Sequence, residues 1–171
     1  MKKLNKNNKG FSLVELLVVI AIMVVLVGVL APTLLGNIEK SRVSSDIQTL
    51  DSVASAIQNT LATESAYGVA TDATNGYTKP TQLKTVIAAT GNSFITVLHE
   101  YLATMPTLKG SSANADNIYF AINATNGQVT VWAVASTDTV DSSTPVPTGT
   151  ASGTVTGTVL NSKQTNYIVV R

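Results

Sequence analysis

The sequence predicts an α+β protein in which one long N-terminal helix packs on a small antiparallel sheet. Three observations support this fold class. An apolar run of membrane-spanning length lies near the start of the chain, and a helical pattern continues beyond it. Two short runs rich in β-branched and aromatic residues flank Asn126-Gly127, which is a strong signal for a two-strand hairpin. The 171 residues allow one membrane segment and one globular domain of ordinary size.

The apolar run extends from Phe11 to Ala31 and is interrupted only by Ser12, Glu15 and Gly28. It meets the roughly 20 residues that a helix needs to span the hydrocarbon core of a bilayer. The leader before it carries four lysines and no acidic residue. Because lysine and arginine are enriched on the cytoplasmic side of membrane helices, we expect the leader in the cytoplasm and everything after the run outside.

Two simpler interpretations of this segment stay open. A secretory signal peptide would have a shorter apolar core. Its most suitable cleavage site, after the small residue Ala31, would place Pro32 immediately after the cut. A plain signal anchor explains the length and the lysines but gives Glu15 no purpose. A carboxylate in a membrane span costs roughly 2.5–3.5 kcal/mol at the helix centre and less toward its ends. Glu15 is therefore expected to have a positive partner.

Residues 10–15 read GFSLVE, a run that resembles the processing site of type IV prepilins and pseudopilins. The resemblance implies that a prepilin peptidase cleaves between Gly10 and Phe11 and methylates the new amino terminus of Phe11. It also implies that Glu15 pairs with the N-terminal amine of a neighbouring subunit during assembly. Pairing would neutralise two charges in a low-dielectric environment, where an unpaired ion is heavily penalised.

Beyond the apolar run, apolar residues recur at three- and four-residue steps as far as Leu61, with charged residues mostly off that line. We expect one helix from Phe11 to about Thr63, with a kink at Pro32, where proline removes a backbone hydrogen bond. The chain is expected to divide into a cleaved cytoplasmic leader (1–10), a transmembrane or filament-core helix (11–32), an amphipathic helix packed on the head (33–66) and a globular head (67–171).

The head is expected to contain turns, one further helix and three or four strands. In chain order we expect a loop at 67–80, a helix at 82–105 interrupted at Gly91-Asn92, strands at 117–122 and 128–134, a surface loop at 137–157, and a final strand at 167–170 with a weaker one around 154–160. This arrangement of a long helix on a small antiparallel sheet is pilin-like.

The composition argues against several classes of function. The chain carries a net charge of +1, and removing the four leader lysines leaves seven basic and ten acidic residues, a net −3. No cluster of lysine or arginine forms a broad charged face, so no nucleic-acid binding is expected. The absence of cysteine excludes a disulfide and a cysteine metal site. Since many Gram-negative pilins close their C-terminal region with a disulfide, this absence favours a Gram-positive source.

We expect no catalytic site, no cofactor and no metal site. His99 is the only histidine, and we expect a solvated helix residue rather than a member of a catalytic triad. Asp138 and Asp141 could offer oxygen ligands to calcium, but the dense acidic spacing of a calcium loop is missing. The tripeptide that starts at Asn123 fits the glycosylation signal, although such short signals recur by chance. The chain is therefore not expected to be an enzyme.

The resemblance implies a structural subunit of a type IV pilus, and we expect a major subunit. The chain would start in the cytoplasmic membrane and end in a helical homopolymer at the cell surface. Its implied partners are other copies of itself, a prepilin peptidase, an assembly ATPase and a membrane platform protein. Two alternatives stay open: a pseudopilin of a secretion or DNA-uptake apparatus, and a minor or tip pilin that acts as an adhesin.

Overall fold

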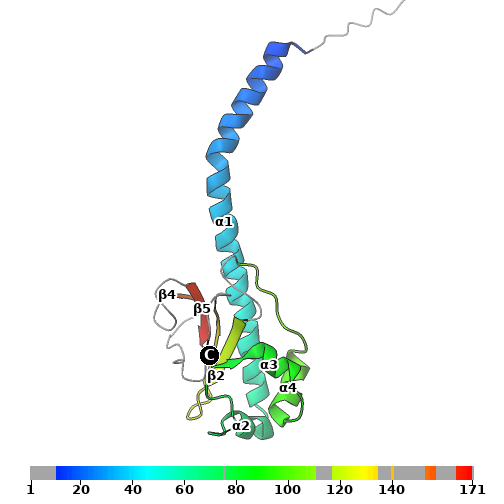
Figure 1. Cartoon of the computed structure of the whole chain (residues 1–171), viewed down its shortest axis with the longest axis vertical. Helices are drawn as coiled ribbons and strands as arrows, with labels where there is room; N and C mark the ends of the chain where they lie inside the picture. The colour runs from blue at the N-terminus through cyan, green and yellow to red at the C-terminus, as the bar shows by residue number, and fades with distance from the viewer. Residues whose placement is uncertain are drawn as a thin grey trace, which may run out of the picture. The chain divides into compact units, whose positions relative to one another are not determined.

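The computed structural model describes residues 11–74, 76–110, 117–134 and 140, together with the backbone of 153–156 and 165–170. These residues belong to two compact units, one ending at Lys40 and the other beginning at Ser41. Helix α1, Leu13–Leu61, contributes to both units (Figure 1). The fold class is α+β and pilin-like, as the sequence predicts, with the long helix packed against a small antiparallel sheet.

The first unit contains the N-terminal part of α1, which is apolar on all sides. Every residue from Phe11 to Ile38 is exposed. An 18-residue window of the helix reaches a mean hydropathy of 3.2 with none of it buried, so one helix is long and apolar enough to cross a membrane. Pro32 lies inside α1, and the kink predicted there stays a prediction, as do the predicted domain boundaries.

The second unit (residues 41–171), called the head from here on, includes the C-terminal part of α1 as well as the region 67–171 and is organised around that helix. Here the helix becomes amphipathic, and its buried apolar residues pack with side chains from α3, α4, β2 and β3. An aromatic group lies in this core: the ring centroids of Tyr77 and Phe94 are 4.5 Å apart, and those of Tyr77 and Phe120 are 5.6 Å apart. The α1 residues that are fully buried in the core are Leu50, Val53, Ala54 and Ile57.

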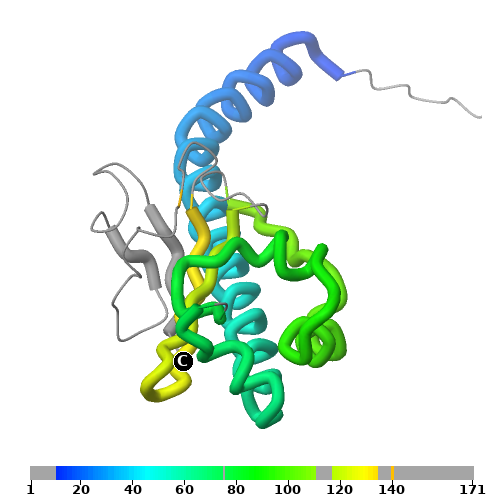
Figure 2. Tube along the Cα trace, turned by 60° about the horizontal axis from the view of Figure 1, so that its bottom comes forward, coloured from blue at the N-terminus to red at the C-terminus, as the bar shows by residue number. Residues whose placement is uncertain are grey.

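Three short helices follow α1 in the head: α2, Glu64–Ala70; α3, Leu83–Ala88; and α4, Ser93–Tyr101. Figures 1 and 2 show α2 at the C-terminal end of α1, with α3 and α4 beside the last turns of α1. The loop predicted at 67–80 is wrong in its first part, because α2 runs to Ala70. Ala66 and Ala70 lie one helical turn apart and are both buried in the core, which offsets the low helix propensity of Gly68.

The interruption predicted at Gly91-Asn92 is confirmed by the break between α3 and α4. Gly91 has a φ of 112°, and the Asn92 side chain caps α4 by accepting the backbone N–H of Ile95 at 2.8 Å. His99 lies on a helix, as predicted, and is half-buried rather than fully exposed. Its Nε2 lies 3.0 Å from the carbonyl oxygen of Ile87, a contact that ties α4 to α3.

The sheet has five strands in the order β1-β2-β3-β5-β4, and all neighbours are antiparallel. The strands are β1, Thr81–Gln82; β2, Ile118–Ile122; β3, Val129–Ala133; β4, Gly153–Thr156; and β5, Thr165–Val170. The hairpin, the final strand and the weaker strand are confirmed, and β4 occupies part of the stretch predicted as a surface loop. The short strand β1 was not predicted and raises the count to five.

Side chains alternate between the two faces of the sheet along β2 and β3. One face carries Phe120 and Val131, which are paired across the strands, and it packs into the main core with α1. The other face carries Tyr119 and Trp132, whose rings stack with centroids 6.2 Å apart, and Val140 packs against this second cluster. Burial raises the pKa of the Tyr119 hydroxyl above its ordinary value near 10.

Candidate processing and assembly site

The run that resembles a prepilin processing site lies at the start of α1. Leu13 is the first helical residue, so Phe11 and Ser12 precede the helix. The side chain of Phe11 is 94 % exposed. Gly10 and the rest of the leader lie outside the described residues. The residue that follows the predicted cleavage point, Phe11, is therefore outside the helix and open to an enzyme.

Ser12 and Glu15 form a capping box at the first turn of α1. The backbone N–H of Ser12 donates to Oε2 of Glu15 at 3.0 Å, and the backbone N–H of Val14 donates to Oγ of Ser12 at 3.3 Å. The helix ladder begins where the N–H of Leu16 donates to the carbonyl of Ser12 at 3.2 Å. These side chains satisfy N–H groups that have no partner within the helix. The carboxylate also lies at the positive end of the helix dipole.

The capping box changes the interpretation of Glu15. From the sequence, this carboxylate is expected to pair only with a group in another subunit, and Ser12 has no expected role. Serine followed three residues later by glutamate, ahead of an apolar run, is the sequence signal of a capping box and was present at 12–15. In a single subunit, Glu15 therefore already has a hydrogen-bond partner within its own chain. Its pairing with a neighbouring amine stays a prediction.

One face of this helix end combines apolar side chains with the carboxylate. Phe11, Val14, Glu15, Val18 and Val19 line an open hollow of about 400 Å³. Their spacing places them along one side of α1, because residues three and four apart are neighbours on a helix surface. The hollow has the length of two helical turns and offers apolar contacts beside one anionic group. Such a face suits a second helix that brings a cation.

The other residues singled out from the sequence do not join this site. Asp138 and Asp141 lie outside the described residues, and within the part of the chain that the structure describes no three histidine, aspartate or glutamate side chains gather. Asn123 is exposed at the β2–β3 turn, where its Oδ1 accepts the backbone N–H of Thr125 at 2.9 Å.

Comparison with known proteins gives one finding, and it concerns the N-terminus. No curated protein and no solved structure matches this chain. Residues 5–31 match the family model described as the prokaryotic N-terminal methylation motif. The match spans the end of the leader, the predicted cleavage point, the capping box and the whole apolar run. The chain therefore carries the type IV prepilin processing site, which indicates a processed protein of the type IV pilin or pseudopilin kind.

Proposed function

We propose that this chain is a structural subunit of a type IV pilus, cleaved by a prepilin peptidase and polymerised into an extracellular filament. One observation carries the proposal: the apolar part of α1 from Phe11 to Ile38 is exposed along its whole length. An apolar surface of that size needs lipid or protein around it. Lipid surrounds it before assembly, and the same helix of other subunits surrounds it afterwards.

Processing prepares the N-terminus for this second environment. Hydrolysis of the bond between Gly10 and Phe11 removes the lysine-rich leader and leaves an ammonium group on Phe11. The peptidase then methylates this amine, which keeps its positive charge. The new cation lies beside the positive end of its own helix dipole, where a positive charge is unfavourable. The carboxylate in its own first turn, that of Glu15, already accepts the backbone N–H of Ser12, so the cation is left to pair with a carboxylate of another subunit.

Glu15 of a neighbouring subunit supplies that carboxylate on assembly. In the free subunit, Glu15 caps its own helix through Ser12. In the filament core, the Glu15 carboxylate and the Phe11 ammonium of the next copy neutralise each other where an isolated ion would be strongly disfavoured. The pairing fixes the axial register between two otherwise featureless apolar helices. Glu15 is thus an assembly residue and has no catalytic role.

The same contact repeated from copy to copy is heterologous, and such contacts generate open helical polymers. Close packing of the apolar helices, with their few polar groups paired, holds the core together. The heads form the outer surface of the filament. The sequence contains no glycine-rich phosphate loop, so an assembly ATPase acting through a membrane platform protein drives extrusion.

A pseudopilin of a secretion or DNA-uptake apparatus is the second candidate, because it would share the processing site and the exposed helix. A minor or tip pilin that acts as an adhesin is a further alternative. Abundance and location separate these functions from that of a major subunit. A major pilin dominates filaments on the cell surface, whereas a pseudopilin stays with the membrane and a tip adhesin is scarce.

The intact mass of the chain in material sheared from the cell surface tests the proposal. A major pilin predicts an abundant species that lacks residues 1–10 and carries one additional methyl group, located on Phe11 by fragmentation. The processed species found only in the membrane fraction would favour a pseudopilin. An unprocessed chain in both fractions would contradict the proposal and leave Glu15 as the cap of a plain membrane anchor.

A further inference from the structure

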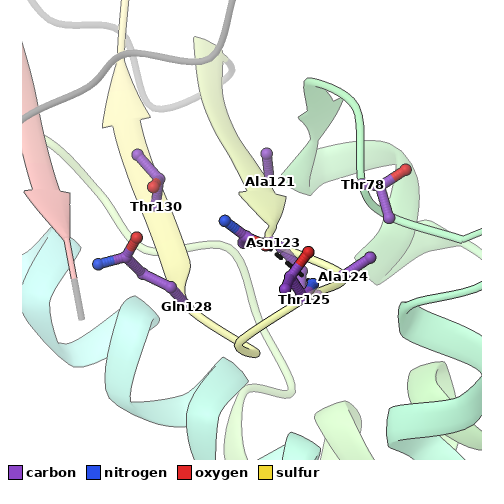
Figure 3. Close-up of a pocket in the computed structure, with 8 residues that line it drawn as sticks. Thr78, Ala121, Asn123, Ala124, Thr125, Gln128 and Thr130 are labelled. Carbon is purple, nitrogen blue, oxygen red and sulfur yellow. Dashed lines mark hydrogen bonds between the residues drawn. The ribbon is translucent and has the colours of Figure 1, made fainter.

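A polar pocket lies at the end of the β2–β3 hairpin, far along the chain from the processing site. Its volume is about 390 Å³, at the lower end of the range for small-molecule sites, roughly 300–1,000 Å³. Figure 3 shows Thr78 on one side of the hairpin end and Gln128 and Thr130 on the other. The polar residues that line the pocket are Thr78, Asn123, Thr125, Gln128 and Thr130.

The described lining of this pocket is uncharged and contains no aromatic ring. It offers three hydroxyls and two carboxamides, and Ala121 supplies part of the apolar remainder. Hydroxyl and carboxamide groups both donate and accept hydrogen bonds. An ionic ligand would find no opposite charge here, and a ligand that binds by stacking would find no flat surface. The lining suits a neutral ligand that carries many hydroxyl groups.

Thr130 gives the strongest indication that the pocket takes a ligand. The residue is only 7 % exposed, yet its hydroxyl makes no hydrogen bond to any residue that the structure describes. Thr130 is paired with Ala121 across the hairpin, and both residues line the pocket. Among the described residues, the only buried side-chain polar atom without a hydrogen-bond partner is Nε1 of Trp132, so the Thr130 hydroxyl is still reached by solvent at the pocket wall. A ligand hydroxyl bound in the pocket would take the place of that solvent.

Asn123, which lines the same pocket, is held in a fixed orientation at the hairpin turn. Its Oδ1 accepts the backbone N–H of Thr125 at 2.9 Å, and its backbone N–H donates to the carbonyl of Gln128 at 2.8 Å. The carbonyl end of the side chain is therefore engaged in the turn, which leaves the Nδ2 group as the donor that the pocket can use. A donor fixed in this way loses little conformational entropy when a ligand binds.

We propose that this pocket binds one residue of a neutral carbohydrate. A hexose ring presents alternating donors and acceptors at its edge, which match the hydroxyls of Thr78 and Thr130, the Nδ2 of Asn123 and the carboxamide of Gln128. Its C–H groups meet the apolar part of the lining around Ala121. The site belongs entirely to the head, so it depends neither on cleavage after Gly10 nor on filament assembly.

The test is saturation-transfer NMR on the full chain in a zwitterionic detergent, since sugar-headed detergents would compete. The probes are glucose, galactose, mannose and N-acetylglucosamine, with N-acetylneuraminic acid and inorganic phosphate as charged probes. At least one neutral sugar is expected to bind more tightly than either charged probe. Failure of all four neutral sugars to bind, or preference for a charged probe, would overturn the proposal.

Three variants locate the binding. Thr130→Val removes the hydroxyl and keeps the shape, and Asn123→Asp keeps the Oδ1 acceptor of the turn while removing the Nδ2 donor. Each is expected to weaken sugar binding about fivefold to tenfold, the effect of one lost hydrogen bond. Thr107→Val makes the same chemical change at an exposed position outside the pocket and is expected to leave binding unchanged.

Thermal unfolding separates a ligand-binding role of Thr130 from a structural one. Because the hydroxyl has no partner among the described residues, Thr130→Val is expected to unfold at the same or a higher temperature while binding sugar less well. Equal binding by wild type, Thr130→Val and Asn123→Asp would overturn the assignment of the pocket. A lower unfolding temperature for Thr130→Val with unchanged binding would do the same.

Discussion

The carboxylate of Asp46 on α1 accepts a 2.7 Å hydrogen bond from the backbone N–H of Gly110, 64 residues further along the chain. Its other oxygen accepts the N–H of Lys109, also at 2.7 Å. Asp46 is fully buried. Since the chain has no helix or strand between α4 and Gly110, these backbone groups lack the partners that regular structure provides. Asp46 thus holds the segment after α4 against the helix.

Replacing Asp46 by alanine is expected to destabilise the head strongly. Hydrogen bonds to charged groups contribute roughly 1.5–3 kcal/mol each, and the loss of both leaves two N–H groups unpaired. We expect the free energy of unfolding of Asp46→Ala to fall by about 2–4 kcal/mol, measured by urea denaturation of the full chain in detergent. Glu100→Ala, an exposed carboxylate on α4, serves as the control. Equal losses for the two variants would contradict the anchoring role of Asp46.

Two substitutions at the capping box separate its local role from the proposed assembly role. Glu15→Gln removes the charge but keeps a side chain that is found at this capping position, whereas Ser12→Ala removes the cap and keeps the charge. We expect Glu15→Gln to be cleaved normally and to yield few filaments. Ser12→Ala is expected to reduce filament yield much less, because a lost cap costs only about 1 kcal/mol.

Filament yield is measured by shearing, and processing by the mass of the membrane-bound chain. Filament yields that fall for Ser12→Ala but not for Glu15→Gln would show that the cap, rather than the charge, is what assembly needs.

Gly10→Val is expected to block processing. Glycine leaves the backbone open to close approach, and a β-branched side chain at the same position obstructs the peptidase. The intact mass should retain residues 1–10 and lack the methyl group, and the chain should stay in the membrane. Asn8→Val places the same side chain two residues before Gly10 and serves as the control. Methylated, normal filaments from Gly10→Val would exclude the proposed cleavage point.

Long periodic patterns and turn chemistry were sufficient to predict α1, the hairpin at Asn126-Gly127 and the break before α4. Strand β1 was not predictable, because a run of two residues has no strand pattern of its own and becomes a strand only by pairing with β2. Helix α2 was missed because Gly68 and the turn residues after it outweighed the spacing of two buried alanines. The capping box was predictable from the local pattern of serine and glutamate at 12–15 alone. The pocket combines residue 78 with residues 121–130, which no local pattern brings together.

Gly127 and Gly68 are expected to respond oppositely to alanine. Gly127 has a φ of 69°, and an added Cβ would lie 3.3 Å from the Tyr67 ring. The left-handed backbone alone costs an L-residue roughly 1–2 kcal/mol, so Gly127→Ala should lower the unfolding temperature. Gly68 lies inside α2 with open space around it, and Gly68→Ala should stabilise by about 0.5–1 kcal/mol. Shifts of the same sign in thermal unfolding would contradict the local geometry of one of the two positions.

A fragment that begins at Gly36 is expected to be soluble and monomeric. The cut removes nearly all of the large exposed apolar side chains of α1. Those that remain exposed in the described part of the fragment are few: Ile38 at 40 %, Tyr67 at 36 % and Tyr101 at 52 %. Scattered residues of this kind are normal on soluble proteins.

The mass in solution, measured by light scattering after gel filtration without detergent, tests this expectation. The matched control begins at Ile20, which restores the exposed apolar turns between Ile20 and Leu35 while leaving the head unchanged. That longer fragment should self-associate, because the restored surface has no partner within its own chain. If the Gly36 fragment also associates, the apolar surface that drives assembly lies on the head, and the proposal that α1 forms the filament core fails.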